Sequence, residues 1–135
     1  MIEMRFEGID AVRQAFDRAE SLALDELERA VDESTEHLLS TSMRLAPKLT
    51  GDLEGSGTKD PTVRRRDEIV GTMGFRGLPY ARRRHEEVYT PGLITRGKPQ
   101  VDGMTPGRKY IEQPLMKYVR RYIEEWADAV RRVLS

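Results

Sequence analysis

The residue types that most often support catalysis or metal binding are sparse in this chain. It has two histidines, His37 and His85, and no cysteine, which excludes disulfides and thiol chemistry. The run His85-Glu86-Glu87 is the one cluster that could bind a metal, but a helical metal site needs a second histidine on the same face and none follows. We therefore expect no enzymatic activity, no cofactor and no metal. A small metal-dependent hydrolase centred on His85 and Glu86 remains an alternative.

Two runs of three arginines form the second group of residues that could take part in binding. They are Arg64, Arg65 and Arg66, and Arg82, Arg83 and Arg84. With aromatic side chains nearby, such runs could contact the phosphates and stack the bases of a single-stranded nucleic acid. Two features argue against this: the formal net charge is zero, and consecutive residues of a strand point to opposite faces. A contact with protein is favoured, and a small nucleic-acid-binding module is kept as the alternative function.

The charges are divided unevenly along the 135 residues. Residues 1–58 carry 6 basic and 13 acidic side chains, whereas residues 59–110 carry 12 basic and 6 acidic ones. This pattern could draw two copies of the chain together head to tail, or it could fold the acidic part onto the basic part of one molecule. If copies associate, the candidate subunit interface pairs acidic side chains of the long helix with basic ones of the middle region. These candidates are Glu28, Asp32, Glu36, Arg64, Arg65, Arg66, Arg82, Arg83, Arg84 and Glu86.

The elements that must position these residues begin with a strand and two helices. Residues 2–6 alternate apolar and charged side chains, as a half-buried strand does, and the spacing at residues 9–16 predicts a short helix. From residue 21 to residue 46 an apolar stripe recurs at helical spacing, which predicts a long amphipathic helix ended by Pro47. The predicted members of the stripe are Leu24, Leu27, Val31, Leu38 and Leu45, with Thr35 and Ser42 between them.

The second half predicts a small sheet and a closing helix. Residues 53–59, 62–66 and 69–75 are expected strands, with a polar turn at Asp67-Glu68. Residues 89–108 show no periodicity, so we expect a flexible loop that orders when it binds. A helix is predicted at residues 110–134, with Pro114 in its first turn. Its predicted apolar stripe is Leu115, Val119, Tyr122, Ile123, Trp126, Val130 and Val133. Residues 1–135 thus predict one α+β domain, a small antiparallel sheet packed against a long helix and a C-terminal helix.

Three segments resemble motifs of one protein family. Residues 47–56, PKLTGDLEGS, resemble the pattern P-x-x-T-G-x-L-x-x-S; residues 80–86, YARRRHE, resemble Y-A-x-x-x-H-E; and residues 107–115, GRKYIEQPL, resemble G-x-K-Y-L-E-x-P-L. These patterns are typical of tail-completion or head–tail joining proteins of long-tailed phages and prophages, which are also labelled minor capsid proteins. The motif positions are Pro47, Thr50, Gly51, Leu53, Ser56, Tyr80, Ala81, Tyr110, Pro114 and Leu115.

The resemblance implies a structural virion protein that is not an enzyme. Such a protein would act by assembling into a homo-oligomeric ring, with six copies as the expected number, in the neck between head and tail. Its partners would be copies of itself and other neck, portal-side or tail-tube proteins, with non-specific contact to genomic DNA allowed. It would be made in the host cytoplasm and reside in the virion, away from any membrane. The motif residues would serve the fold, and the run of arginines at residues 82–84 departs from the family pattern.

Overall fold

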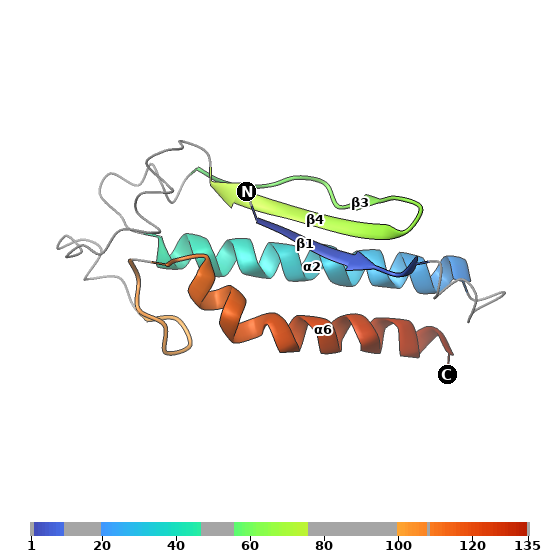
Figure 1. Ribbon diagram of the computed structural model, residues 1–135. Coiled ribbons are helices and arrows are strands. Elements are labelled where there is room, and N and C mark those ends of the chain that lie inside the picture. Colours follow the sequence, from blue (N-terminus) through green and yellow to red (C-terminus); the bar gives the residue numbers. More distant parts are fainter. Residues whose placement is uncertain (1, 10–19, 47–55, 76–99, 108, 135) are drawn as a thin grey trace.

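A computed structural model describes residues 2–9, 20–46, 56–75, 100–107 and 109–134 (Figure 1). Its elements are strand β1 (Ile2–Glu7), helix α2 (Glu20–Leu45), strands β2 (Gly57–Lys59), β3 (Val63–Arg64) and β4 (Glu68–Phe75), and helix α6 (Glu112–Leu134). The four strands form one antiparallel sheet beside two long helices, so the predicted α+β class is confirmed. The short helix predicted at residues 9–16 lies outside the described residues, apart from buried Ile9.

Strand β4 is the centre of the sheet. It pairs with β1 along one edge and with β2 and β3 along the other, and every pairing is antiparallel. The three strands predicted after the long helix are present, but the first two are shorter than predicted where the structure describes them: β2 begins at Gly57, and β3 has only two residues of the predicted 62–66. The turn between β3 and β4 differs slightly, because Glu68 already belongs to β4 and the Arg65 N–H donates to its carbonyl at 2.8 Å. Residues 53–55 of the first predicted strand lie outside the described residues.

Helix α2 packs against the sheet through its apolar stripe. Leu27, Val31, Leu38 and Leu45 are fully buried and Leu24 is nearly so, as predicted from their spacing. The small polar residues Thr35 and Ser42 are also buried on this stripe. At the closest approach of helix and sheet, a Cβ atom added to Gly71 of β4 would lie 2.1 Å from the Thr35 hydroxyl oxygen. Glycine at this point therefore allows the sheet to lie directly on the helix.

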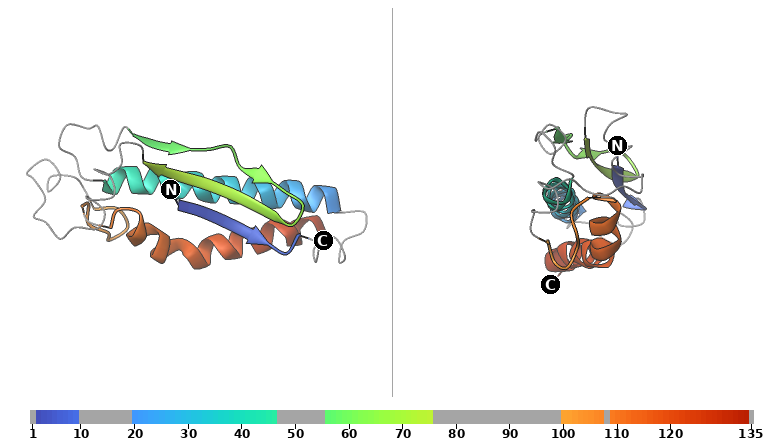
Figure 2. Two further views of the ribbon diagram at one scale, coloured as in Figure 1. Left: turned by 45° about the horizontal axis from the view of Figure 1, so that its top comes forward. Right: turned by 90° about the vertical axis from the view of Figure 1, so that its left-hand side faces the viewer.

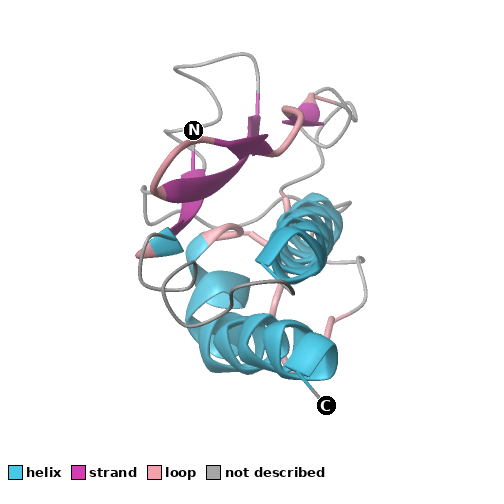
Figure 3. Ribbon diagram, turned by 90° about the vertical axis from the view of Figure 1, so that its right-hand side faces the viewer, coloured by secondary structure: helices cyan, strands magenta, loops and turns pink. Residues whose placement is uncertain are grey.

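Helix α6 runs antiparallel to α2 and lies beside it, away from the sheet (Figures 1 and 3). Its buried side chains include Pro114, Tyr118, Tyr122 and Ala129, and both tyrosines contact His37 of α2. The predicted stripe was wrong for Val119 and Ile123, which are 38% and 54% exposed. The buried face is rotated from the predicted one by about one residue position, because α6 carries two adjacent apolar stripes and only one of them packs inward. Pro114 does lie in the first turn of the helix, as predicted.

One buried core joins the helices to the sheet. Its larger cluster takes side chains from β1, β4, α2, α6 and residues 101–104, and its smaller cluster gathers around Leu27 and Ile69. Trp126 of α6 contacts both clusters, and its indole N–H donates to the Ser34 hydroxyl of α2 at 2.9 Å. The views in Figure 2 show the helices and the sheet as parallel layers along one long axis.

Candidate functional site

The three segments that carry the motifs leave the described fold at one end of the molecule. Helix α2 ends at Leu45 just before the first motif, β4 ends at Phe75 before the second, and α6 begins just after Gly107, where the third starts (Figure 1). The Gly107 N–H donates to the Leu45 carbonyl at 2.8 Å. Phe75 pairs with Gly57 across the sheet, and its ring meets the Tyr110 ring edge-on at 5.0 Å. We call this region, formed by residues 45–46, 56–57, 75, 101–107 and 109–110, the motif end.

The described motif residues have structural positions at the motif end. Tyr110 and Pro114 are fully buried, whereas Leu115 and Ser56 are half-buried. Gly107 has a backbone φ of 128°, a conformation that favours glycine, which explains the residue type at this motif position. The other motif positions lie outside the described residues, as do the predicted interface residues of the second motif. These are Pro47, Thr50, Gly51, Leu53, Tyr80, Ala81, Arg82, Arg83, Arg84 and Glu86.

A hairpin with a two-residue turn forms part of the motif end and was missed in the sequence. Val101 and Met104 form an antiparallel bridge around Asp102-Gly103, whose φ angles of 49° and 81° are both in the left-handed region. Asp-Gly between two apolar residues is a known signal for this type of turn and could have revealed it. Val101 and Met104 are buried in the larger core cluster. Part of the segment predicted to be a flexible loop at residues 89–108 is therefore ordered; residues 89–99 and 108 are outside the described residues.

Two tyrosines and a histidine connect the hairpin to both helices. The Tyr118 hydroxyl donates to the Asp102 carboxylate, and the Lys117 ammonium donates to the Asp102 carbonyl. The His37 ring meets the Tyr118 ring edge-on at 4.9 Å, and its Nδ1 lies 2.6 Å from the Tyr122 hydroxyl oxygen. The cluster therefore ties the C-terminal half of α2 to the first half of α6 and to the hairpin.

The protonation states of this cluster fit a structural role. Burial lowers the pKa of His37, and the positive charge of Arg121 lowers it further. Burial and the hydrogen bond to Asp102 raise the pKa of Tyr118 to about 12, and burial also raises the pKa of Tyr122. At neutral pH the imidazole is therefore neutral and both phenols keep their protons, so that Tyr122 can donate to Nδ1 of His37. The pair of His37 and Tyr122 is thus a satisfied polar contact between two neutral groups.

The first arginine run lies far from the motif end, on β3 and the turn after it. Arg64 forms ion pairs with Asp25 at 3.0 Å and Glu28 at 3.6 Å on α2 of the same molecule. Lys59 of β2 donates to Asp32 at 2.5 Å, and this bond, with one from Thr62, lowers the pKa of Asp32. For these residues the structure confirms the alternative in which the acidic helix contacts the basic strands of its own chain.

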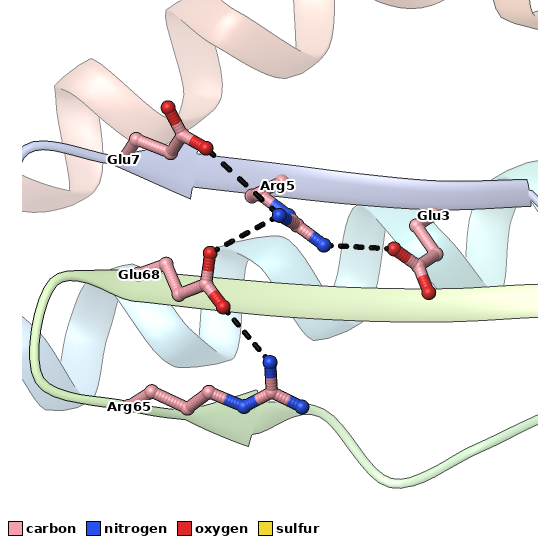
Figure 4. Close-up of polar contacts among 5 residues, drawn as sticks. All are labelled: Glu3, Arg5, Glu7, Arg65 and Glu68. Atoms are coloured by element: carbon pink, nitrogen blue, oxygen red, sulfur yellow. Dashed lines mark hydrogen bonds and ion pairs between the residues drawn. The ribbon is translucent and has the colours of Figure 1, made fainter.

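The outer face of the sheet carries a ladder of alternating charges (Figure 4). Arg5 of β1 contacts Glu3 at 3.0 Å and Glu68 of β4 at 3.3 Å, and Arg65 contacts the other oxygen of Glu68 at 3.0 Å. Arg66, the last of the run, and Glu36 of α2 also lie outside the core. The described residues of this face carry both signs interspersed, whereas a nucleic-acid site is typically a basic patch or stripe.

Metal sites and membrane spans were also sought in the described ranges. Within residues 2–9, 20–46, 56–75, 100–107 and 109–134, no group of three or more acidic or histidine side chains could hold a metal ion. His85 and Glu86 are outside these ranges, so the hydrolase alternative stays a prediction. Neither α2 nor α6, the two long helices of the described chain, has an apolar stretch that could cross a bilayer.

Comparisons with known protein families, with curated protein sequences and with solved structures found no match to this chain.

Proposed function

We propose that this chain is a structural virion protein of a tailed phage or prophage, which acts in the neck between head and tail by assembling with copies of itself. The observation that carries the proposal is that the described elements next to the three motif segments in the sequence meet at the motif end. The hydrogen bond from Gly107 to Leu45 and the contacts of Phe75 with Gly57 and Tyr110 hold the bases of all three segments together. The described elements that border these segments in the sequence therefore meet at one end of the molecule.

The mechanism in this proposal is assembly without chemistry. A rigid frame is needed, so that each copy presents its motif end to its neighbour in the same orientation around a ring. Two features supply rigidity: α2 and α6 lie side by side, and the hairpin at residues 101–104 is fixed by Tyr118 and Lys117. The three motif segments would then provide the surface that contacts the next subunit, and the packed core would keep each subunit rigid.

The structure changes which charges we assign to the contact between copies. Arg64, Glu28 and Asp32 already form ion pairs inside one molecule, and Arg65 is paired with Glu68. The second run, Arg82, Arg83 and Arg84, follows β4 in the sequence, and β4 ends at Phe75 in the motif end. We propose that this second run supplies the basic partner in the ring and that Arg64 stabilises the monomer.

The virion role is tested by locating the protein in particles. An antibody raised against the purified chain should place gold label at the head–tail junction of virions from the host that carries the gene. Virions that contain no detectable copy of the chain by mass spectrometry would refute the proposal. Label on the capsid shell or the tail tip would refute the neck position.

The ring contact is tested by charge reversal in two matched variants. Replacing Arg82, Arg83 and Arg84 with glutamate should abolish rings in electron micrographs and leave the thermal unfolding midpoint unchanged. Replacing Arg64 with glutamate should lower the midpoint, because it sets a third carboxylate beside Asp25 and Glu28. Equal ring formation by the first variant and the parent would contradict the assignment.

A further inference from the structure

Helix α6 has an apolar stripe that no part of the described chain covers. Met116, Val119 and Ile123 are 68%, 38% and 54% exposed, and their spacing of three and four residues places them on one face. Figure 1 shows α6 on the outside of the molecule, with α2 along one side only. Half-buried Trp126 and Val130 continue the same spacing towards the C-terminus. The stripe therefore has the heptad period of a helix-pairing seam; its members Met116, Val119 and Ile123 are exposed, whereas Trp126 and Val130 also pack against the core.

The charges of α6 are arranged in blocks that reverse about its middle. An acidic residue is followed by three basic residues, then by three acidic residues, then by two basic residues: Glu112; Lys117, Arg120 and Arg121; Glu124, Glu125 and Asp128; Arg131 and Arg132. When two copies of this helix are placed antiparallel, every block of one copy lies level with a block of opposite charge on the other, although only some members of each block border the exposed stripe. When they are placed parallel, every block faces its own sign.

Arg120 and Glu124 border the exposed stripe, each one position after an apolar member. They are exposed and one helical turn apart, so they could pair with each other as Arg121 and Glu125 do at 2.7 Å. Within the described part of the chain, however, neither Arg120 nor Glu124 forms an ion pair. Both are therefore available to a partner that covers the stripe.

We propose that a second copy of this chain docks on the exposed stripe of α6, with the two α6 helices antiparallel and a two-fold axis near the level of Tyr122. In this arrangement Arg120 lies level with Glu124 of the second copy, and Glu124 lies level with Arg120 of the second copy. Ile123 of each copy lies close to the axis, between Val119 and Ile123 of the other. The apolar side chains supply the driving force, and the charges set the antiparallel direction.

The size of the stripe predicts a weak dimer. Three exposed apolar side chains and two symmetric ion pairs form an interface at the small end of known protein contacts. We expect a dissociation constant in the micromolar range, with a monomer–dimer equilibrium visible by sedimentation velocity. A two-fold contact of this kind does not depend on the proposed ring, in which neighbours meet through different surfaces.

Cysteine cross-linking tests the position of the two-fold axis. The chain has no native cysteine, so any disulfide that forms must join the introduced residues. Ile123→Cys should form a covalent dimer under mild oxidation, because the two sulfur atoms approach each other across the axis. The matched control is Asp128→Cys, an exposed residue on the opposite side of α6, which should stay monomeric under the same conditions. Equal cross-linking of both variants, or none at Ile123→Cys, would overturn the proposal.

Charge exchange tests the antiparallel pairing. Arg120→Glu alone, or Glu124→Arg alone, converts both attractive pairs into repulsive ones and should raise the dissociation constant about tenfold or more. The double exchange R120E/E124R restores opposite charges across the axis and should return the constant to within about threefold of the parent value. Circular dichroism checks that all three variants keep their helices.

A double variant as weak as the single ones would overturn the pairing, and a parent chain that stays monomeric into the millimolar range would overturn the dimer itself. Neither result would bear on the neck proposal, which is tested by label on virions. Conversely, a dimer in solution with no copy in virions would sustain this inference and refute the proposed function.

Discussion

The substitution Gly71→Ala tests the packing of helix on sheet most sharply. The new Cβ atom would lie 2.1 Å from the Thr35 hydroxyl oxygen and 3.2 Å from both the Thr35 Cβ and the Val31 Cγ1. Thr35 cannot rotate away easily, because its branched side chain is stiff and its hydroxyl donates to the Val31 carbonyl at 2.8 Å. The strand must therefore move away from the helix by more than an ångström.

The expected loss in the free energy of unfolding follows from this geometry. Inserting a methyl group into a well-packed core costs about 1–3 kcal/mol, and the fixed position of Thr35 places this case at the upper end. Alanine is less flexible than glycine in the unfolded chain, and this difference stabilises the folded state by about 0.5–1 kcal/mol. We therefore expect Gly71→Ala to lower the free energy of unfolding by about 2 kcal/mol, measured by urea denaturation with an unchanged slope.

The double variant identifies the cause. Thr35→Ala removes the hydroxyl that the new methyl group meets, so the pair G71A/T35A should be more stable than the sum of the single effects by about 1–2 kcal/mol. Thr35→Ala alone serves as the control for the lost hydrogen bond. A Gly71→Ala protein within about 0.5 kcal/mol of the parent, or strictly additive effects in the double variant, would refute the close approach described above.

Three further predictions concern pH, the hairpin and the contact between helices. Because the folded-state pKa of His37 lies below its unfolded value of 6.5, the unfolded chain binds the proton more readily; stability is full above that value and falls as the pH drops below it. In a His85→Gln background, His37→Gln should flatten this part of the curve of unfolding free energy against pH, and an unchanged curve would refute the assignment. Gly103→Ala should cost about 1 kcal/mol in thermal unfolding, because its φ is 81°; no loss would contradict the turn. Trp126→Phe should cost about 1 kcal/mol in urea unfolding by removing the hydrogen bond to Ser34, and a matching loss in Ser34→Ala with no further loss in the double variant would show that both report the same bond.

The sequence predicted the helices and strands better than it predicted which face of each helix is buried. The stripe of α2 is the only run of apolar residues on that helix with helical spacing, so its burial follows directly from the pattern. Helix α6 has two such stripes side by side, and spacing alone does not decide which one meets α2. The tertiary contact of Tyr122 with His37 and of Trp126 with Ser34 selects the inner one, and leaves Val119 and Ile123 outside.

The candidate site was predicted in part. The motifs marked three segments far apart in the sequence, but only the antiparallel course of the helices and the direction of β4 bring the described elements that border those segments to one end. The charge pattern could not tell whether Arg64 meets an acidic helix of its own chain or of another, because both satisfy the same electrostatics. The Asp102-Gly103 turn was readable from its residue types and was overlooked, since its flanking apolar run is only one residue long on each side.

The central claim is that the motif end contacts its neighbours in a phage neck. A cryo-EM reconstruction of the head–tail junction of virions that carry this gene tests it most directly. We predict a ring of identical densities that fit α2, α6 and the sheet, with the ends of α2 and β4 and the hairpin at residues 101–104 against an adjacent subunit. A ring that fits this fold with its motif end facing solvent, or a junction with no density for this chain, would contradict the account.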